Sequence, residues 1–192
     1  MIAIVKYNAG NIKSVQNALT RLGYESMITD DPLELINADK VIFPGVGEAS
    51  STMQYLKERG LDKTIISLLQ PVLGICLGLQ LMCRFSEEGE TKCLGIFDVD
   101  VRLFPPVDKI PHMGWNNFLT IKGDLFKGIT IEDDLYYVHS YYPEISSCTM
   151  ATCDYILPFS AAMQKDNFFA TQFHPEKSAE TGEKILKNFL EQ

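Results

Sequence analysis

The sequence predicts a single α/β domain with a central, mostly parallel sheet that is flanked by helices and extended by antiparallel strands. Short apolar and β-branched runs alternate with segments of helical spacing up to about residue 85. Strands that alternate with helices favour a parallel sheet covered on both faces. The chain has 192 residues, 46% of them hydrophobic, which suits one globular domain with its own core. No linker, repeat or low-complexity tract divides it, so we expect the domain to span 1–192.

The elements of the first half follow from apolar spacing and from turn residues. We expect strands at 1–7, 24–29, 40–43 and 71–75, and helices at 12–22, from 31, at 51–59 and at 77–85. Asn8-Ala9-Gly10-Asn11 is expected to turn the first strand into the first helix, which Gly23 ends. Asp31-Pro32 is typical of a helix start.

The second half is predicted to contain shorter strands separated by loops. We expect strand-like runs at 94–101, 117–121, 135–142 and 159–164. Prolines and glycines between these runs indicate turns, so antiparallel pairing is favoured. A last helix at 179–190 has its apolar residues on one side.

Charge and cysteine content limit the classes of function. Seventeen Lys and Arg against 25 Asp and Glu give a net charge of −8, the wrong sign for binding nucleic acid or an anionic membrane. No apolar run reaches the ~18 residues of a membrane span, and no signal peptide is recognisable at the start. Five cysteines, an odd number, suit a reducing compartment, so we expect a cytoplasmic protein.

Gly74-Ile75-Cys76-Leu77-Gly78 lies where a buried strand is expected to give way to a helix. A nucleophile elbow requires this context, because glycines allow the sharp turn and the helix N-terminus favours a thiolate. Cys76 is therefore a candidate nucleophile. Alternatively, Cys76 is a small buried cysteine between turn glycines.

His174-Pro175-Glu176 follows a strand-like run and supplies a candidate base. A carboxylate two residues beyond a histidine can fix its tautomer and support an imidazolium. Such a pair alone is more often a surface ion pair. The presence of Cys76 in the same chain favours a Cys-His-Glu triad.

Pro44-Gly45-Val46-Gly47 follows the third expected strand and leaves backbone N–H groups unshielded. One of these N–H groups, from Val46 or Gly47, together with the N–H of Leu77, is a candidate oxyanion hole. A plain turn is the alternative, and the third glycine of a dinucleotide-binding motif is missing. Cys148 and Cys153 have the proximity of metal ligands but lack a second ligand pair nearby, so we predict no metal and assign them to the core.

Read together, these segments resemble the class I (triad) glutamine amidotransferases, and within them the family of glutaminase subunits of imidazole glycerol phosphate synthase. The similarity spans essentially the whole chain. The segments that carry it are 7–11 with Ser14-Val15, 44–47, 74–80, 111–116, 137–142 and 172–178. The chain departs from the family pattern at Glu48-Ala49-Ser50-Ser51 and at Asp98-Val99-Asp100.

The resemblance implies a flavodoxin-like sheet, glutaminase activity and no cofactor. It implies that Cys76 is the nucleophile, His174 the general acid and base, and Glu176 the carboxylate that orients it. The substrate-binding residues that it implies are Gly47, Gln80, Glu88, Ser140 and Tyr141, the last two through their backbone. From sequence alone, Glu88 is as easily part of a solvated acidic loop.

The resemblance also implies a heterodimer with a cyclase subunit that is a (β/α)₈ barrel. The barrel uses the ammonia to make imidazole glycerol phosphate and aminoimidazole carboxamide ribotide in histidine biosynthesis, a lyase reaction of the complex. The expected interface residues are His112, Met113, Trp115 and Asn116, because the segment has the aromatic composition of an interface anchor. A core tryptophan is an equal alternative.

Three other functions have to be weighed. A glutaminase subunit of another amidotransferase, such as pyridoxal phosphate synthase or anthranilate synthase, would share the triad. The 111–116 and 137–142 segments disfavour it. A cysteine peptidase or hydrolase of similar fold is expected to lack Gln80, and an inactive partner-binding subunit is disfavoured by the complete triad.

Overall fold

An eight-stranded sheet runs through the molecule in the computed structural model, which describes residues 1–7 and 10–192. Its first five strands, in the order β2-β1-β3-β4-β14, are parallel, and β13, β12 and β9 continue it antiparallel. The strands are β1 (Ile2–Val5), β2 (Ser26–Thr29), β3 (Lys40–Phe43), β4 (Val72–Ile75), β9 (Thr120–Ile121), β12 (Thr149–Tyr155), β13 (Leu157–Lys165) and β14 (Phe168–Thr171). The predicted mostly parallel, flavodoxin-like sheet with antiparallel additions is confirmed.

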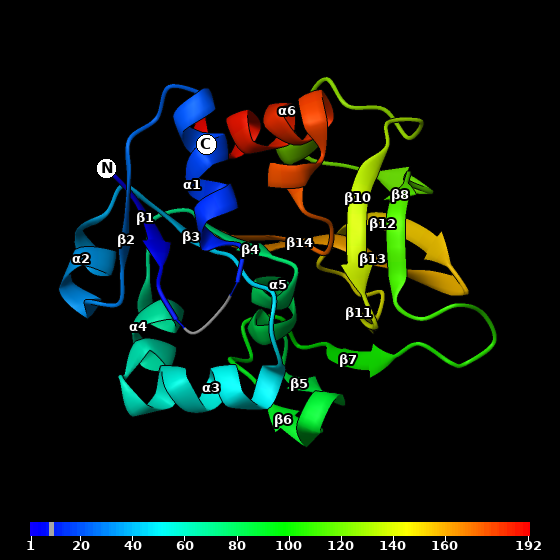
Figure 1. Cartoon of the computed structure of the whole chain (residues 1–192), viewed down its shortest axis with the longest axis horizontal. Helices are drawn as coiled ribbons and strands as arrows, with labels where there is room; N and C mark the ends of the chain where they lie inside the picture. The colour runs from blue at the N-terminus through cyan, green and yellow to red at the C-terminus, as the bar shows by residue number, and fades with distance from the viewer. Residues whose placement is uncertain (8–9) are drawn as a thin grey trace.

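Helices cover the sheet on both faces (Figure 1). One face carries α1 and α6, and the other carries α3, α4 and α5. The helices are α1 (Ile12–Arg21), α2 (Pro32–Asn37), α3 (Ala49–Glu58), α4 (Leu61–Ser67), α5 (Leu77–Met82) and α6 (Ala179–Leu190), and the short 3₁₀ helices are η1 (Glu88–Glu90), η2 (Asp124–Phe126) and η3 (Pro175–Lys177).

The sheet separates two hydrophobic cores because successive side chains of a strand point to opposite faces. In β1, Ala3 and Val5 pack into the core beneath α3, α4 and α5, whereas Ile2 and Ile4 pack against α1 and α6. All four side chains are buried. Such continuous burial is expected of a parallel strand covered on both faces.

Two smaller sheets lie beside the antiparallel end of the main sheet (Figure 1). One pairs two antiparallel strands, β8 (His112–Asn116) and β10 (Leu135–His139). The other has the order β11-β7-β5-β6, with β5 (Phe85–Ser86), β6 (Thr91–Lys92), β7 (Asp100–Leu103) and β11 (Tyr141–Pro143). These strands bring residues 100–143 next to the main sheet, where the site is built.

The predicted strand at 94–101 is wrong over most of its length. The backbone N–H groups of Leu94, Gly95 and Phe97 donate to the carbonyls of Leu81, Cys83 and Met82 at 2.8–2.9 Å. The segment therefore serves the carbonyls at the end of α5 instead of pairing as a strand. Only β7 overlaps the prediction, from Asp100.

Other boundaries differ from the expected ones. The predicted run at 135–142 is two strands, β10 and β11, in different sheets, and only 120–121 of the run at 117–121 is a strand. The helix α4 and the strands β8 and β12 are not predicted from the sequence. Asn8 and Ala9 of the predicted first turn lie outside the described residues. Among the residues that the structure describes, no helix has the length and apolar character needed to cross a membrane.

Candidate active site

The candidate residues lie beyond the carboxyl ends of adjacent parallel strands. Pro44 to Gly47 follow β3, Cys76 follows β4, and His174 comes shortly after β14. Because parallel strands end at the same edge, residues far apart in the sequence meet there. Cys76 and His174, which are separated by 97 residues in the chain, thus belong to one site.

Cys76 occupies a sharp, left-handed elbow between β4 and α5. Its φ is 52° and its ψ is −104°, a conformation that non-glycine residues rarely adopt. Its N–H donates to Thr171 O at 2.7 Å. A strained turn that projects the nucleophile between strand and helix is the geometry of a nucleophile elbow.

The glycines on either side of Cys76 are required by close approach. A Cβ at Gly78 would lie 1.9 Å from the carbonyl oxygen of Phe43, and a Cβ at Gly74 would lie 3.0 Å from the backbone of Gly78. Neither position has room for a side chain. The predicted function of the two glycines in the Gly-x-Cys-x-Gly motif is thus met in the structure.

The histidine and the carboxylate of the candidate triad form a buried pair. Nδ1 of His174 lies 2.7 Å from Oε1 of Glu176, and both side chains are inaccessible to solvent. Nε2 of His174 is also buried and has no hydrogen-bond partner among the described residues. Since Glu176 occupies Nδ1, the unpaired Nε2 is the atom available to exchange a proton with Cys76.

The pKa of His174 reports the electrostatics of the site. Burial lowers this pKa, but the neighbouring Cys76 thiolate and the Glu176 carboxylate together outweigh burial and raise it to about 10. The site therefore favours the imidazolium form of His174 next to the sulfur of Cys76. A thiolate is the nucleophilic form of cysteine.

Two side chains that the sequence analysis did not assign to the site support the triad. Asn11 donates through Nδ2 to Oε1 of Glu176 and lies 3.4 Å from Nδ1 of His174. Gln172 is fully buried, and its Nε2 lies 3.6 Å from the Cys76 sulfur. The sequence signals were that Asn11 belongs to the family-like segment 7–11 and that Gln172 stands two residues before the histidine.

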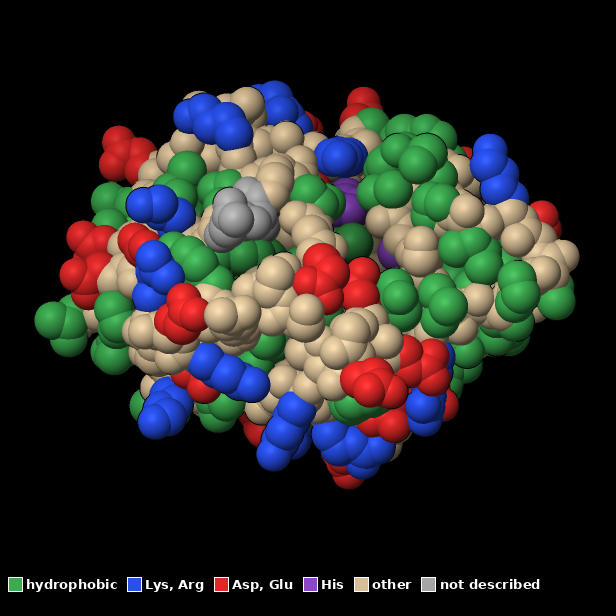
Figure 2. Space-filling view, turned by 60° about the horizontal axis from the view of Figure 1, so that its bottom comes forward, with side chains coloured by type: hydrophobic (Ala, Val, Ile, Leu, Met, Phe, Trp, Pro, Cys, Tyr) green, Lys and Arg blue, Asp and Glu red, His purple; other side chains and the backbone are tan. Residues whose placement is uncertain are grey.

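A cavity of about 280 Å³ opens beside Cys76. It brings together all five residues predicted to bind substrate, together with Cys76, the oxyanion candidates and three residues that were not predicted, Pro111, Val138 and His139. Its lining is Val46, Gly47, Cys76, Leu77, Gln80, Glu88, Pro111, Val138, His139, Ser140 and Tyr141. Figure 2 shows histidine atoms at the bottom of a hollow, with acidic side chains on one rim and hydrophobic side chains on another.

Glu88 is the acidic group of the cavity. Its Oε2 accepts a hydrogen bond from the N–H of Ala49 at 2.8 Å. Burial raises the pKa of Glu88, the Ala49 N–H lowers it, and the nearby Glu48 raises it further. Glu88 is thus held in place at the cavity rather than in a freely solvated loop.

Glu48, one of the departures from the family pattern, caps α3. Its two carboxylate oxygens accept from the N–H groups of Ser50 and Ser51 at 2.9 and 2.8 Å. These hydrogen bonds, above all the one from Ser51, lower the pKa of Glu48 to about 2 despite partial burial. At this departure from the family pattern, Glu48 therefore serves as the N-cap of α3.

The oxyanion donor predicted at Leu77 is occupied in this conformation. The N–H of Leu77 donates to the carbonyl oxygen of Gly45 at 3.3 Å. The hydroxyl of Tyr7 donates to the carbonyl of Pro44 and so holds the same segment. Burial, together with the Cys76 thiolate, raises the pKa of Tyr7 well above its usual range, so this hydroxyl keeps its proton.

The four predicted interface residues do not share one environment. Met113 and Trp115 are 61% and 55% exposed, so the alternative of a core tryptophan is wrong. His112 is buried, because it points to the other face of β8 and stacks on Tyr137 and Tyr155 with ring centroids 4.9 and 4.0 Å apart. The interface with a partner therefore stays a prediction, in which Met113 and Trp115 are the exposed side chains of the segment.

The cysteines outside the elbow are free and mostly buried. Cys83, Cys93 and Cys153 are buried, and Cys148 is partly buried. Among residues 1–7 and 10–192, no group of three His, Cys, Asp or Glu side chains is placed to hold a metal ion.

Comparisons with known proteins identify the family. A sequence model of the family described as Glutamine amidotransferase class-I matches residues 3–192. Relatives described as "Imidazole glycerol phosphate synthase subunit HisH" are 64% identical in Bacteroides fragilis, 61% in Bacteroides thetaiotaomicron and 46% in Escherichia coli. Each match covers 99% of this chain and 98% of the relative.

Solved structures show the same fold at low sequence identity. A structure described as a glutamine amidotransferase has a TM-score of 0.75 at 16% identity and covers 100% of this chain and 98% of its own. PurLQS from Thermotoga maritima has a TM-score of 0.73 at 16% identity, with coverage of 99% and 97%. On the family model and the near full-length relatives, the chain belongs to the class-I glutamine amidotransferases and, within them, to the family of HisH subunits of imidazole glycerol phosphate synthase.

Proposed function

We propose that this chain hydrolyses L-glutamine to L-glutamate and ammonia, and delivers the ammonia to a cyclase subunit that makes imidazole glycerol phosphate. One observation carries the proposal. Cys76, strained at its elbow, faces a cavity lined by Gln80 and Glu88 and lies beside the buried pair of His174 and Glu176. We further propose that 1–192 acts as one amidotransferase domain, since the family model matches nearly its whole length.

The first step forms a thioester. The Cys76 sulfur attacks the side-chain amide carbon of glutamine, and the carbonyl oxygen takes up the negative charge. The C–N bond then breaks, and Nε2 of the His174 imidazolium gives its proton to the departing nitrogen, which leaves as ammonia. Glu176 holds Nδ1 throughout, so the other nitrogen stays directed at the reacting atoms.

The second step regenerates the enzyme. The now neutral imidazole of His174 accepts a proton from water, and the hydroxide attacks the thioester carbon. The C–S bond breaks, glutamate is released, and the sulfur again forms a thiolate beside the imidazolium. The positive charge that His174 carries at the start of each cycle agrees with its raised pKa.

The cavity supplies groups for the amino-acid end of glutamine. The carboxylate of Glu88 suits the substrate ammonium group by charge, and it is held in place by Ala49 N–H. The backbone of Ser140 and Tyr141 lines the same cavity and offers hydrogen bonds to the substrate. Gln80 braces this backbone by donating to Tyr141 O at 2.9 Å.

The oxyanion needs backbone N–H donors, and one candidate donor, the N–H of Leu77, is bonded to the segment 44–47 in this conformation. We assign this function to the N–H of Leu77 together with an N–H of Val46 or Gly47. The Leu77 N–H becomes available when its 3.3 Å bond to Gly45 O opens. Docking of the partner is the event that we expect to open it, so the free chain should be a slow glutaminase.

The partner that we propose is a separate (β/α)₈-barrel cyclase, forming a heterodimer in the cytoplasm. Ammonia released into water at neutral pH would become largely ammonium, which is not a nucleophile, so direct delivery to the cyclase avoids this loss. The complex would carry the lyase activity that yields imidazole glycerol phosphate and aminoimidazole carboxamide ribotide in histidine biosynthesis. The exposed Met113 and Trp115 supply a docking surface, and five free cysteines suit a reducing compartment.

The test is synthesis by the purified complex with two nitrogen sources. Cys76→Ala should abolish glutamine-dependent synthesis and leave synthesis from ammonium salts nearly unchanged. Loss of both activities, or undiminished use of glutamine, would overturn the proposal. The matched control for partner identity is the wild-type chain assayed with the acceptor subunit of another amidotransferase. That subunit should not stimulate its glutaminase activity.

A further inference from the structure

Two buried histidines that the proposed chemistry does not use are in direct contact. Nδ1 of His112 lies 3.1 Å from Nε2 of His139, and both side chains are buried. His139 lines the glutamine cavity, and its Nδ1 lies 2.8 Å from the carbonyl oxygen of Tyr141. At the other end, Nδ2 of Asn116 lies 3.3 Å from Nε2 of His112.

The direction of these hydrogen bonds is fixed by the last acceptor. A carbonyl oxygen can only accept, so Nδ1 of His139 carries the hydrogen and donates to Tyr141 O. In a neutral imidazole the other nitrogen is then an acceptor, so Nδ1 of His112 donates to Nε2 of His139. By the same rule, Nε2 of His112 accepts from Asn116. Every donor in the chain therefore points toward the cavity.

Both imidazoles are neutral at neutral pH. Burial lowers the pKa of His112 to about 4. Burial also lowers the pKa of His139 to about 3, and the neighbouring His112 and His174 contribute in the same direction against the hydrogen bond to Tyr141. The tautomers derived above therefore apply at the pH at which the enzyme works.

The carbonyl group of Tyr141 connects this chain of hydrogen bonds to the active site. It also accepts from Nε2 of Gln80, which lies 3.1 Å from Oε1 of Gln172, the side chain beside the Cys76 sulfur. Phe104 N–H donates to Ser140 O at 3.0 Å, so the following residue, Tyr141, directs its backbone groups away from β7. Side chains rather than a neighbouring strand thus hold this carbonyl.

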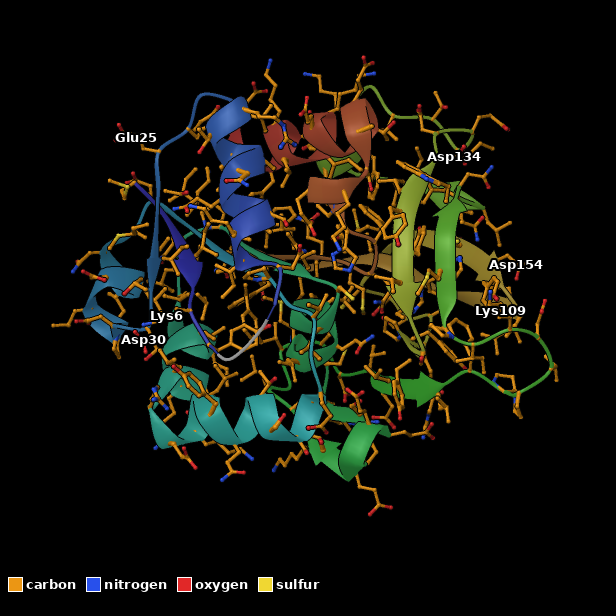
Figure 3. The ribbon with its side chains drawn as sticks, in the orientation of Figure 1. Lys6, Glu25, Asp30, Lys109, Asp134 and Asp154 are labelled. Atoms are coloured by element: carbon orange, nitrogen blue, oxygen red, sulfur yellow. The ribbon has the colours of Figure 1, made fainter. Side chains whose placement is uncertain are left out.

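The outer end of the chain lies on the strand that carries the exposed surface. Asn116 is half-buried on β8 and also donates to the backbone oxygen of Asp154 at 3.0 Å. Figure 3 shows the labelled Asp154 beside β8 at the margin of the molecule. His112 cannot turn freely, since it is stacked between Tyr137 and Tyr155 at interplanar angles of 21° and 12°.

We propose that His139 is a positioning residue for glutamine: with His112 and Asn116 it forms a one-directional chain of neutral donors that fixes the Tyr141 backbone at the cavity and is anchored at its outer end on β8. The proposal rests on the proposed function, because the ligand that it positions is glutamine. His139 acts through Tyr141 and takes no part in proton transfer.

Kinetics of the complex with cyclase test the proposal. His139→Leu removes the donor and should raise the KM for glutamine by about tenfold, with a smaller fall in kcat. His139→Asn places an amide donor near the former Nδ1 and should restore most of the affinity. An unchanged KM in His139→Leu, or a KM in His139→Asn as high as in His139→Leu, would overturn the proposal.

A double-mutant cycle distinguishes a continuous chain of hydrogen bonds from independent packing effects of the two histidines. His112→Phe keeps the stacking on Tyr137 and Tyr155 but removes the donor, and should raise KM by about threefold. In the double variant with His139→Leu, His112→Phe should cause no further rise in KM, because His139→Leu has already interrupted the hydrogen-bond chain. Fully additive losses would contradict the chain. Tyr155→Phe keeps the stacking and both histidines, and as the matched control it should show the wild-type KM.

A spectroscopic readout judges the proposal even where a variant does not fold. The polypeptide has three histidines, and the positively charged His174 is distinguished by its charge, so the two remaining ring ¹⁵N signals of the labelled wild-type subunit in the complex can be judged without a variant. His139 and His112 should both appear as neutral Nδ1–H tautomers, and an Nε2–H tautomer at His139 would exclude the chain. Failure of the wild type to hydrolyse glutamine would instead sink the proposed function, and leave the tautomers to be judged separately.

Discussion

His174 Nδ1 and Glu176 Oε1 are 2.7 Å apart, and both side chains are fully buried. Asn11 donates to the same carboxylate oxygen, so Glu176 is held on two sides. A buried, oriented carboxylate both fixes the imidazole tautomer and stabilises its charged form. The relationship leads directly to a prediction for each partner.

Glu176→Gln should lower kcat for glutamine hydrolysis by about 10²- to 10⁴-fold, as when the equivalent carboxylate of a triad is neutralised. The amide preserves the size of the side chain but no longer stabilises the imidazolium. Steady-state kinetics of the complex measure the effect. Glu180→Gln, an exposed carboxylate in the first turn of α6, is the control and should behave as wild type. Equal activities in both variants would contradict the role of Glu176.

Cys76→Ala should lower the pKa of His174 from its value of about 10, because the thiolate is the largest of the influences that raise it. NMR titration of labelled histidine measures this pKa in both proteins. In the wild type, the raised pKa stabilises the folded chain fully below pH ~6.5, the unfolded value, and that stabilisation is lost as pH rises through about 10. An unchanged His174 titration in Cys76→Ala would show that the two side chains are not coupled.

Gly78→Ala should destabilise the chain by at least ~1–3 kcal/mol, the usual penalty for overpacking. The new Cβ would lie 1.9 Å from the carbonyl oxygen of Phe43, and backbone cannot move aside as a flexible side chain can. Urea unfolding measures the change. Gly47→Ala is the matched control, because its Cβ would meet Leu77 at an ordinary 3.5 Å. Similar unfolding of both variants would argue against a tight elbow.

Trp115→Ala should weaken binding of the cyclase by about 2 kcal/mol or more, which is a rise in Kd of about 30-fold. Large exposed aromatic side chains are the usual anchors of interfaces, and Trp115 stands with Met113 on one face of β8. Calorimetric titration of the two subunits gives the Kd. Ile36→Ala, a change of another exposed apolar residue on the distant α2, should leave it unchanged.

The sequence was sufficient to predict those parts of the site that depend on neighbours in the chain. The elbow follows from glycines around Cys76 after a buried strand, and the His174–Glu176 pair from its two-residue spacing. Contacts between distant segments left no comparable signal. Asn11 reaches Glu176 across 165 positions, and its polar side chain alone did not distinguish it from a turn residue.

Errors in the second half also have physical reasons. The buried positions of β12 are Thr149, Ala151 and Cys153, which are too small or too polar to give the alternating hydrophobic pattern of a strand. The run at 94–101 is apolar enough to resemble a strand, yet its N–H groups are used by the end of α5. The inward orientation of His112 follows from alternation along β8, a strand that the sequence pattern does not predict.

Because Cys76 has a positive φ, the position of its sulfur depends on the surrounding sheet. A non-glycine residue at φ 52° keeps that conformation only while β4, the Thr171 carbonyl and the crowded glycine at 78 hold it. We expect gentle warming that loosens these restraints to let the backbone of Cys76 relax while most of the chain is still folded. Glutaminase activity should therefore be lost at a lower temperature than secondary structure.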